Sequence, residues 1–136
     1  MGLAALLAVV AVAGCSRKRT IGRDEVRSEI RSAISFVAES EMFVDYIRQG
    51  HATRHYAEEH AAYLEDAVEQ SAKELEQGTP EPGTENAVHE CRIQLELLCH
   101  ELSGIRAAIG NNNALAAAKE RMGSIRARLE KANSSL

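Results

Sequence analysis

The side chains able to do chemistry in this chain include five histidines and three cysteines, and their spacing matches no familiar catalytic motif. The sequence lacks zinc-protease, redox-dithiol, covalent-haem, nucleophile-elbow and phosphate-loop motifs. No histidine has glutamate three positions before it, so the Glu-x-x-His pairs of di-iron bundles are absent too. The sequence therefore predicts no catalytic machinery, and we expect the chain not to be an enzyme.

One group of histidines has a spacing that suits metal chelation. His51, His55 and Glu59 follow one another at intervals of four residues, which places them on one side of a helix. Imidazole and carboxylate groups in that arrangement can hold a divalent ion. The three positions point away from the apolar stripe of their own segment, however, so a solvated polar face is the preferred interpretation.

Four amphipathic segments must position these side chains, because apolar residues recur at intervals of three and four. Pro80 and Pro82, the only prolines, separate the second segment from the third, and Gly50 and Gly110 mark the other two joints. No segment alternates polar and apolar residues with period two, which argues against a sheet. The segments span residues 24–49, 53–77, 85–109 and 114–133.

Short connections favour antiparallel neighbours, so the sequence predicts an all-α, up-down-up-down four-helix bundle. Gly50 leaves an alternative open, since glycine costs a helix only about 1 kcal/mol relative to alanine. A continuous helix over residues 24–77 would be about 80 Å long and would leave a three-helix protein. Such a rod could hardly bury its stripe without a partner chain, so a homodimer is one form of this alternative. We favour a turn at Gly50.

Folding the segments back on one another predicts a polar layer across the bundle. The first hairpin sets Glu41 opposite His60, and the next two add Cys99, His100 and Met122 at the same level. A Glu41–His60 pair that fixes helix register is the preferred interpretation, because buried polar groups are usually paired; it needs no cofactor. A metal site of Glu41, His60 and Cys99 is one alternative. A non-covalent haem ligated by His60 with Met122 or Cys99 is another.

Composition argues against a nucleic-acid partner. The net charge is -4, the aromatic content is 4%, and tryptophan is absent, so the chain offers neither a basic phosphate-binding face nor many aromatic side chains on which bases could stack.

Cys91 and Cys99 stand eight residues apart on one predicted helix, or about 12 Å along its axis. That separation exceeds the reach of a disulfide, so we expect both thiols to be free of each other.

The chain begins with an uncharged apolar run, MGLAALLAVVAVAGC, that ends in small residues directly before Cys15. The run is shorter than the roughly 20 residues that span a bilayer and has the length of a signal-peptide core. This stretch resembles the lipobox of bacterial lipoproteins. The resemblance implies cleavage after Gly14 and acylation of the Cys15 thiol. The alternatives are a short uncleaved anchor and a coincidental apolar start.

Three regions follow from this interpretation. Residues 1–14 form the signal peptide, residues 15–23 form a lipidated cysteine and basic tether, and residues 24–136 form the helical domain. The basic side chains of the tether are placed to contact anionic lipid; they are Arg17, Lys18, Arg19 and Arg23. We expect a lipid-anchored protein of the cell membrane, facing the periplasm or the outer surface.

The expected function is non-catalytic binding of an envelope protein or component. Its partners are membrane lipid through Cys15 and an unnamed envelope component, and a homodimer is a further arrangement compatible with the sequence. The competing function is a periplasmic metal- or haem-binding bundle that acts as a sensor or carrier through the polar layer.

The anchor gives a direct prediction. Because acylation needs the thiol of one cysteine, Cys15→Ser in the full-length chain releases the protein from membranes or leaves it unprocessed. Membrane fractionation and the intact mass of the mature chain measure both effects, with Cys91→Ser as the matched control. Unchanged attachment together with unchanged mass contradicts lipidation and favours the uncleaved anchor.

Overall fold

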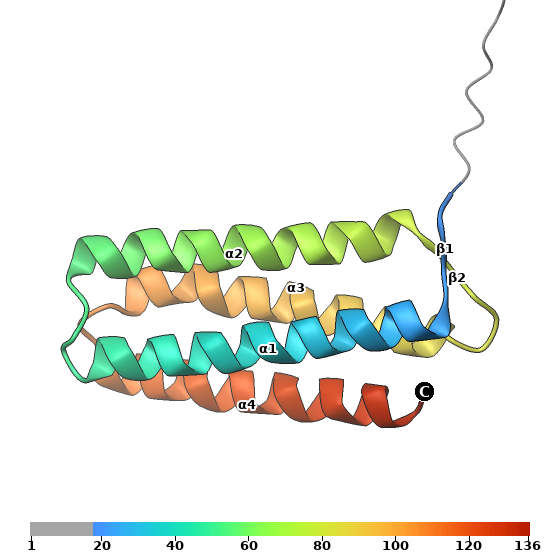
Figure 1. The fold of residues 1–136 in the computed structure, drawn as a ribbon. Coiled ribbons are helices and arrows are strands. Elements are labelled where there is room, and N and C mark those ends of the chain that lie inside the picture. The colour runs from blue at the N-terminus through green and yellow to red at the C-terminus, as the bar shows by residue number, and fades with distance from the viewer. Residues whose placement is uncertain (1–17) are drawn as a thin grey trace, which may run out of the picture.

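Four antiparallel helices make up almost all of residues 18–136, the part of the chain that the computed structural model describes (Figure 1). The predicted signal peptide and Cys15 lie outside the described residues. The helices are α1 (Arg23–Arg48), α2 (Arg54–Gln77), α3 (Glu85–Ala108) and α4 (Asn112–Ser134). The prediction of an all-α four-helix bundle is confirmed.

Local signals set the helix ends where the sequence placed them. The chain turns at Gly50 and Gly110 in a left-handed conformation, with φ of 76° and 92°, which glycine adopts without a steric penalty. Thr53 and Asn111 then cap α2 and α4 by accepting hydrogen bonds from Tyr56 N–H and Ala114 N–H. The alternative of one helix over residues 24–77 is therefore wrong, because α1 ends at Arg48.

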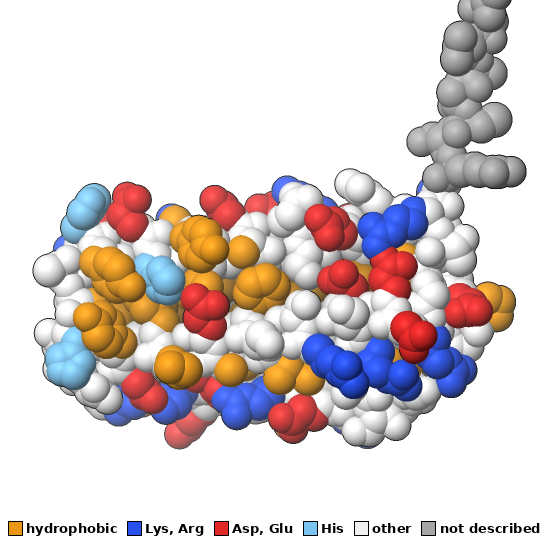
Figure 2. Space-filling model, viewed as in Figure 1, with side chains coloured by type: hydrophobic (Ala, Val, Ile, Leu, Met, Phe, Trp, Pro, Cys, Tyr) orange, Lys and Arg blue, Asp and Glu red, His pale blue; other side chains and the backbone are white. Residues whose placement is uncertain are grey.

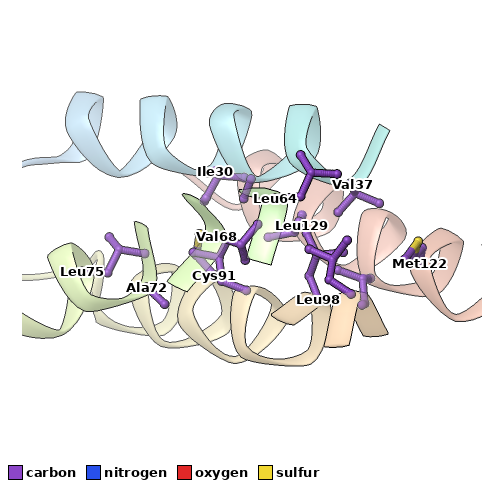
Figure 3. Close-up of a cluster of buried hydrophobic side chains, with 14 of the residues drawn as sticks. Ile30, Val37, Leu64, Val68, Ala72, Leu75, Cys91, Leu98, Met122 and Leu129 are labelled. Atoms are coloured by element: carbon purple, nitrogen blue, oxygen red, sulfur yellow. The ribbon is translucent and has the colours of Figure 1, made fainter. Parts of the chain in front are cut away.

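Each helix contributes one apolar stripe to a single core (Figure 3). Figure 3 shows Ile30 and Val37 of α1 near Leu64 of α2 and Leu129 of α4, with Leu98 of α3 closing the cluster. These five side chains are almost completely removed from solvent. Burial of this kind is the main driving force of folding, at about 1.5–3 kcal/mol for each large side chain.

The helices do not pack equally on all sides. α3 packs against both α2 and α4, and α1 packs mainly against α4, whereas α1 and α2 make few contacts with each other. Figure 1 shows this side from the front, with α2 above α1 and α3 visible behind them. We call the α1–α2 side the open side of the bundle.

A small clip closes the end of the bundle opposite Gly50. β1 (Thr20–Ile21) pairs in parallel with β2 (Thr79–Pro80), with Thr79 N–H donating to the Arg19 carbonyl at 2.8 Å. The Ile21 side chain is buried in the core. The sequence assigned residues 20–23 to the tether, because two-residue strands carry no periodic signal. They belong to the folded domain instead.

Two of the four basic residues expected to contact lipid also serve the fold. Arg19 forms an ion pair with Glu25, and the Arg23 guanidinium donates to the Leu136 carbonyl at 2.9 Å.

Within residues 18–136, no helix combines the length and the apolarity that crossing a bilayer requires.

The clip predicts opposite effects for one substitution at two glycines. A Cβ at Gly78 would overlap the side chain of buried Ile21, whereas a Cβ at Gly104, exposed inside α3, meets nothing within 4 Å. Gly78→Ala should lower the free energy of unfolding by about 1–3 kcal/mol. Gly104→Ala should raise it by about 0.5–1 kcal/mol, because alanine is the better helix former. Urea denaturation measures both, and destabilisation of equal size at both positions contradicts the packing of Ile21 under Gly78.

Candidate functional site

The predicted pair of Glu41 and His60 is not formed. Glu41 is buried against α4, where its carboxylate forms an ion pair with Arg126, and His60 Nε2 lies 3.7 Å from Glu39 Oε1 instead. The predicted position of His60 along the length of α1 was correct to within two residues. The predicted rotation of α1 about its own axis was wrong, because residues 39 and 41 point about 200° apart around a helix.

The other members of the predicted layer are also dispersed. Met122 is a fully buried core residue, and His100 is exposed. The Cys99 thiol donates to the Glu65 carbonyl at 3.7 Å. Within residues 18–136, no three histidine, cysteine or acidic side chains gather in a way that could hold a metal ion. Glu41, His60 and Cys99 are therefore not brought together in the described residues. Haem ligation by His60 with Met122 or Cys99 stays a prediction.

The two helix cysteines are also weak nucleophiles. Burial raises the pKa of the Cys91 thiol to about 12, with a smaller contribution from the charge of Glu29. Burial and then the charge of Glu65 raise the pKa of Cys99 to about 11. Thiolate is the reactive form, so both groups stay protonated and unreactive at neutral pH. Neither cysteine forms a disulfide within the described residues, in agreement with the expectation that Cys91 and Cys99 do not bridge each other.

The His51, His55 and Glu59 group likewise does not come together as a chelating site. His51 precedes α2 in the turn, so the helical spacing does not extend to it. Its ring contacts Tyr46 edge-on at 5.3 Å between ring centroids. All three side chains are exposed, which agrees with the interpretation as a solvated polar face.

Ion pairs between a carboxylate and arginine or lysine join three sides of the bundle. They connect α1 to α4, α3 to α4, and α2 to α3; examples are Glu41–Arg126, Asp45–Lys119, Glu101–Arg121 and Glu65–Arg106. The Glu101–Arg121 pair is bidentate, with distances of 2.7 and 2.8 Å. These ion pairs add electrostatic contacts to the apolar packing between α1 and α4, α3 and α4, and α2 and α3.

The open side is joined differently. Ser71 of α2 donates to Glu29 of α1 at 3.4 Å near the clip, and toward Gly50 the contact is aromatic. Phe43 of α1 lies edge-on against His60 of α2, with ring centroids 4.7 Å apart. Among the described residues, no lysine or arginine forms an ion pair across the open side.

A patch of exposed aromatic and apolar side chains covers the end of the open side nearest Gly50. We call it the aromatic face; it consists of Met42, Tyr46, Tyr56, His60 and Tyr63, with Phe43 beneath them. Met42 is 74% exposed and the three tyrosines are 44–64% exposed. These are all the tyrosines in the chain. Figure 2 shows this group of apolar side chains and histidines at the end away from the clip.

The rings of the aromatic face contact one another in a continuous series. His60 lies between Tyr56 and Tyr63, with nearly parallel rings and centroids 5.6 and 5.9 Å away. Tyr46 of α1 meets Tyr56 edge-on, with ring centroids 6.2 Å apart, which extends the ring contacts across the open side. Rings held by their neighbours lose little conformational entropy when a partner binds, so the face is preorganised.

Sequence reasoning missed this face. The signal was present, since Tyr56, His60 and Tyr63 follow an i, i+4, i+7 spacing on α2. Tyr46 and Met42 could not be assigned to the same surface, because the sequence does not give the rotation of α1 relative to α2. Isolated exposed aromatic residues are also ordinary on protein surfaces.

Comparisons with known proteins identify no relative of this chain. No protein-family model matches the chain, and neither a curated protein nor a solved structure matches it significantly.

Proposed function

We propose that the chain is a membrane-anchored, non-catalytic binding module whose aromatic face holds a protein of the cell envelope. The observation that supports this is the exposure of Met42 and all three tyrosines in one patch, in which Tyr56, His60 and Tyr63 stack and Tyr46 lies edge-on against Tyr56. Exposed apolar patches mark interaction sites, and tyrosine is enriched among the residues that contribute most to binding.

The position of the face suits a tethered module. The described chain begins at the clip, and the aromatic face lies at the other end of α1 (Figure 1). Met42 and Tyr46 follow Arg23, the first residue of α1, by 19 and 23 residues, which places them about 28 and 35 Å along the helix from the clip end. A lipid at Cys15 would then hold the clip near the bilayer and present the face to a partner farther out.

Site-specific cross-linking in cells that normally make this protein tests the proposal. A photoreactive phenylalanine analogue at Tyr63 of the full-length chain should give a discrete cross-linked protein, whereas the same analogue at exposed Ala127 of α4 should not. Tyr46→Ala should reduce the Tyr63 cross-link severalfold, because Tyr46 belongs to the same contact surface. His89→Ala, an exposed position on α3, serves as the control and should leave it unchanged.

Equal cross-linking from positions 63 and 127, or none from position 63, contradicts the assignment of the aromatic face as the binding surface.

A further inference from the structure

Charge is distributed unevenly between the helices. α2 carries seven acidic and two basic side chains, whereas α4 carries five basic and two acidic ones. The net charge of the whole chain is only -4, so the negative charge is concentrated on the α2 side. A local excess of this kind attracts a partner of opposite charge and speeds its association.

Carboxylates flank the rings of the aromatic face. Glu39 lies one helical turn from Met42, Glu59 lies one turn from both Tyr56 and Tyr63, and Asp66 lies one turn beyond Tyr63. Within residues 18–136, the only ion pair of these three carboxylates is the 3.7 Å contact of Glu39 with His60. None is paired with a lysine or arginine, in contrast to Glu41, Glu65 and Glu101 on the joined sides of the bundle.

We infer that the segment bound at the aromatic face is positively charged and presents arginine or lysine side chains to the tyrosine rings. This inference rests on the proposed function and names the chemistry of its partner. A guanidinium or ammonium group is attracted to the face of a tyrosine ring. The neighbouring carboxylates can accept its hydrogen bonds, and the apolar part of the cationic side chain fits against Met42 and the ring edges.

The same charges disfavour other occupants. A second copy docked face to face about a two-fold axis would bring its own Glu39, Glu59 and Asp66 against these carboxylates, and like charges across an interface are destabilising. Anionic lipid headgroups and nucleic-acid phosphates are repelled for the same reason. A cationic protein segment satisfies both the rings and the carboxylates.

Tyrosine fluorescence can report on this surface alone, because the chain has no tryptophan and its three tyrosines all lie on the aromatic face. The probes are the capped peptide Gly-Arg-Gly-Arg-Gly-Arg-Gly and the same peptide with neutral citrulline in place of arginine. The arginine peptide should change the fluorescence of the full-length chain saturably. The citrulline peptide should bind at least about tenfold more weakly, because it lacks the charge that the rings and carboxylates recognise.

Two double variants with equal change of net charge separate local recognition from bulk charge. Glu39→Gln with Glu59→Gln should weaken arginine-peptide binding about fivefold, since exposed charge pairs contribute modestly. Glu120→Gln with Glu130→Gln, at exposed positions of α4, should leave it nearly unchanged.

Three results overturn the inference: no saturable signal from the arginine peptide, equal binding of the citrulline peptide, or equal weakening by both double variants. Each leaves the proposed function standing if Tyr63 still cross-links a partner. Loss of that cross-link counts against the proposed function itself.

Discussion

The ion pair between Glu41 and Arg126 is the constraint on which the arrangement of this bundle depends. Glu41 lies in the middle of an apolar stripe and is only 8% exposed, so its charge must meet a cation or lose much of its solvation without compensation. Arg126 on α4 supplies that cation, and Asp45–Lys119 adds a second link between the same helices. α1 is therefore rotated toward α4. A buried charge, as well as apolar area, thus decides which helix is the principal neighbour of α1.

That rotation explains the character of the open side. Once Glu41 faces α4, the positions two residues to either side of it turn toward α2 and solvent, which places Glu39 and Phe43 against His60. The stacked rings then occupy the space where arginine–carboxylate pairs join the other sides. The combination of preorganised rings and uncompensated carboxylates is consistent with a surface kept available for a partner.

The sequence predicted those features that depend on local signals. Gly50 and Gly110 marked two of the turns, because glycine conformation is a property of a few neighbouring residues. Helix rotation depends instead on which distant cation meets Glu41, and no periodicity along one helix reports that choice. The expected Glu41–His60 pair was therefore wrong, the two-residue strands of the clip gave no signal, and the aromatic face emerged only when α1 and α2 were placed side by side.

A double-mutant cycle on the free energy of unfolding tests whether Glu41 contacts Arg126 of α4 rather than His60 of α2. Glu41→Gln and Arg126→Gln, measured singly and together, should show a coupling energy of about 0.5–3 kcal/mol, as contacting residues do. The parallel cycle of Glu41→Gln with His60→Gln should be additive within about 0.5 kcal/mol. Additivity between Glu41 and Arg126, together with coupling between Glu41 and His60, would contradict the ion pair to α4, because Glu41 would then face α2 and the aromatic face would not exist as described.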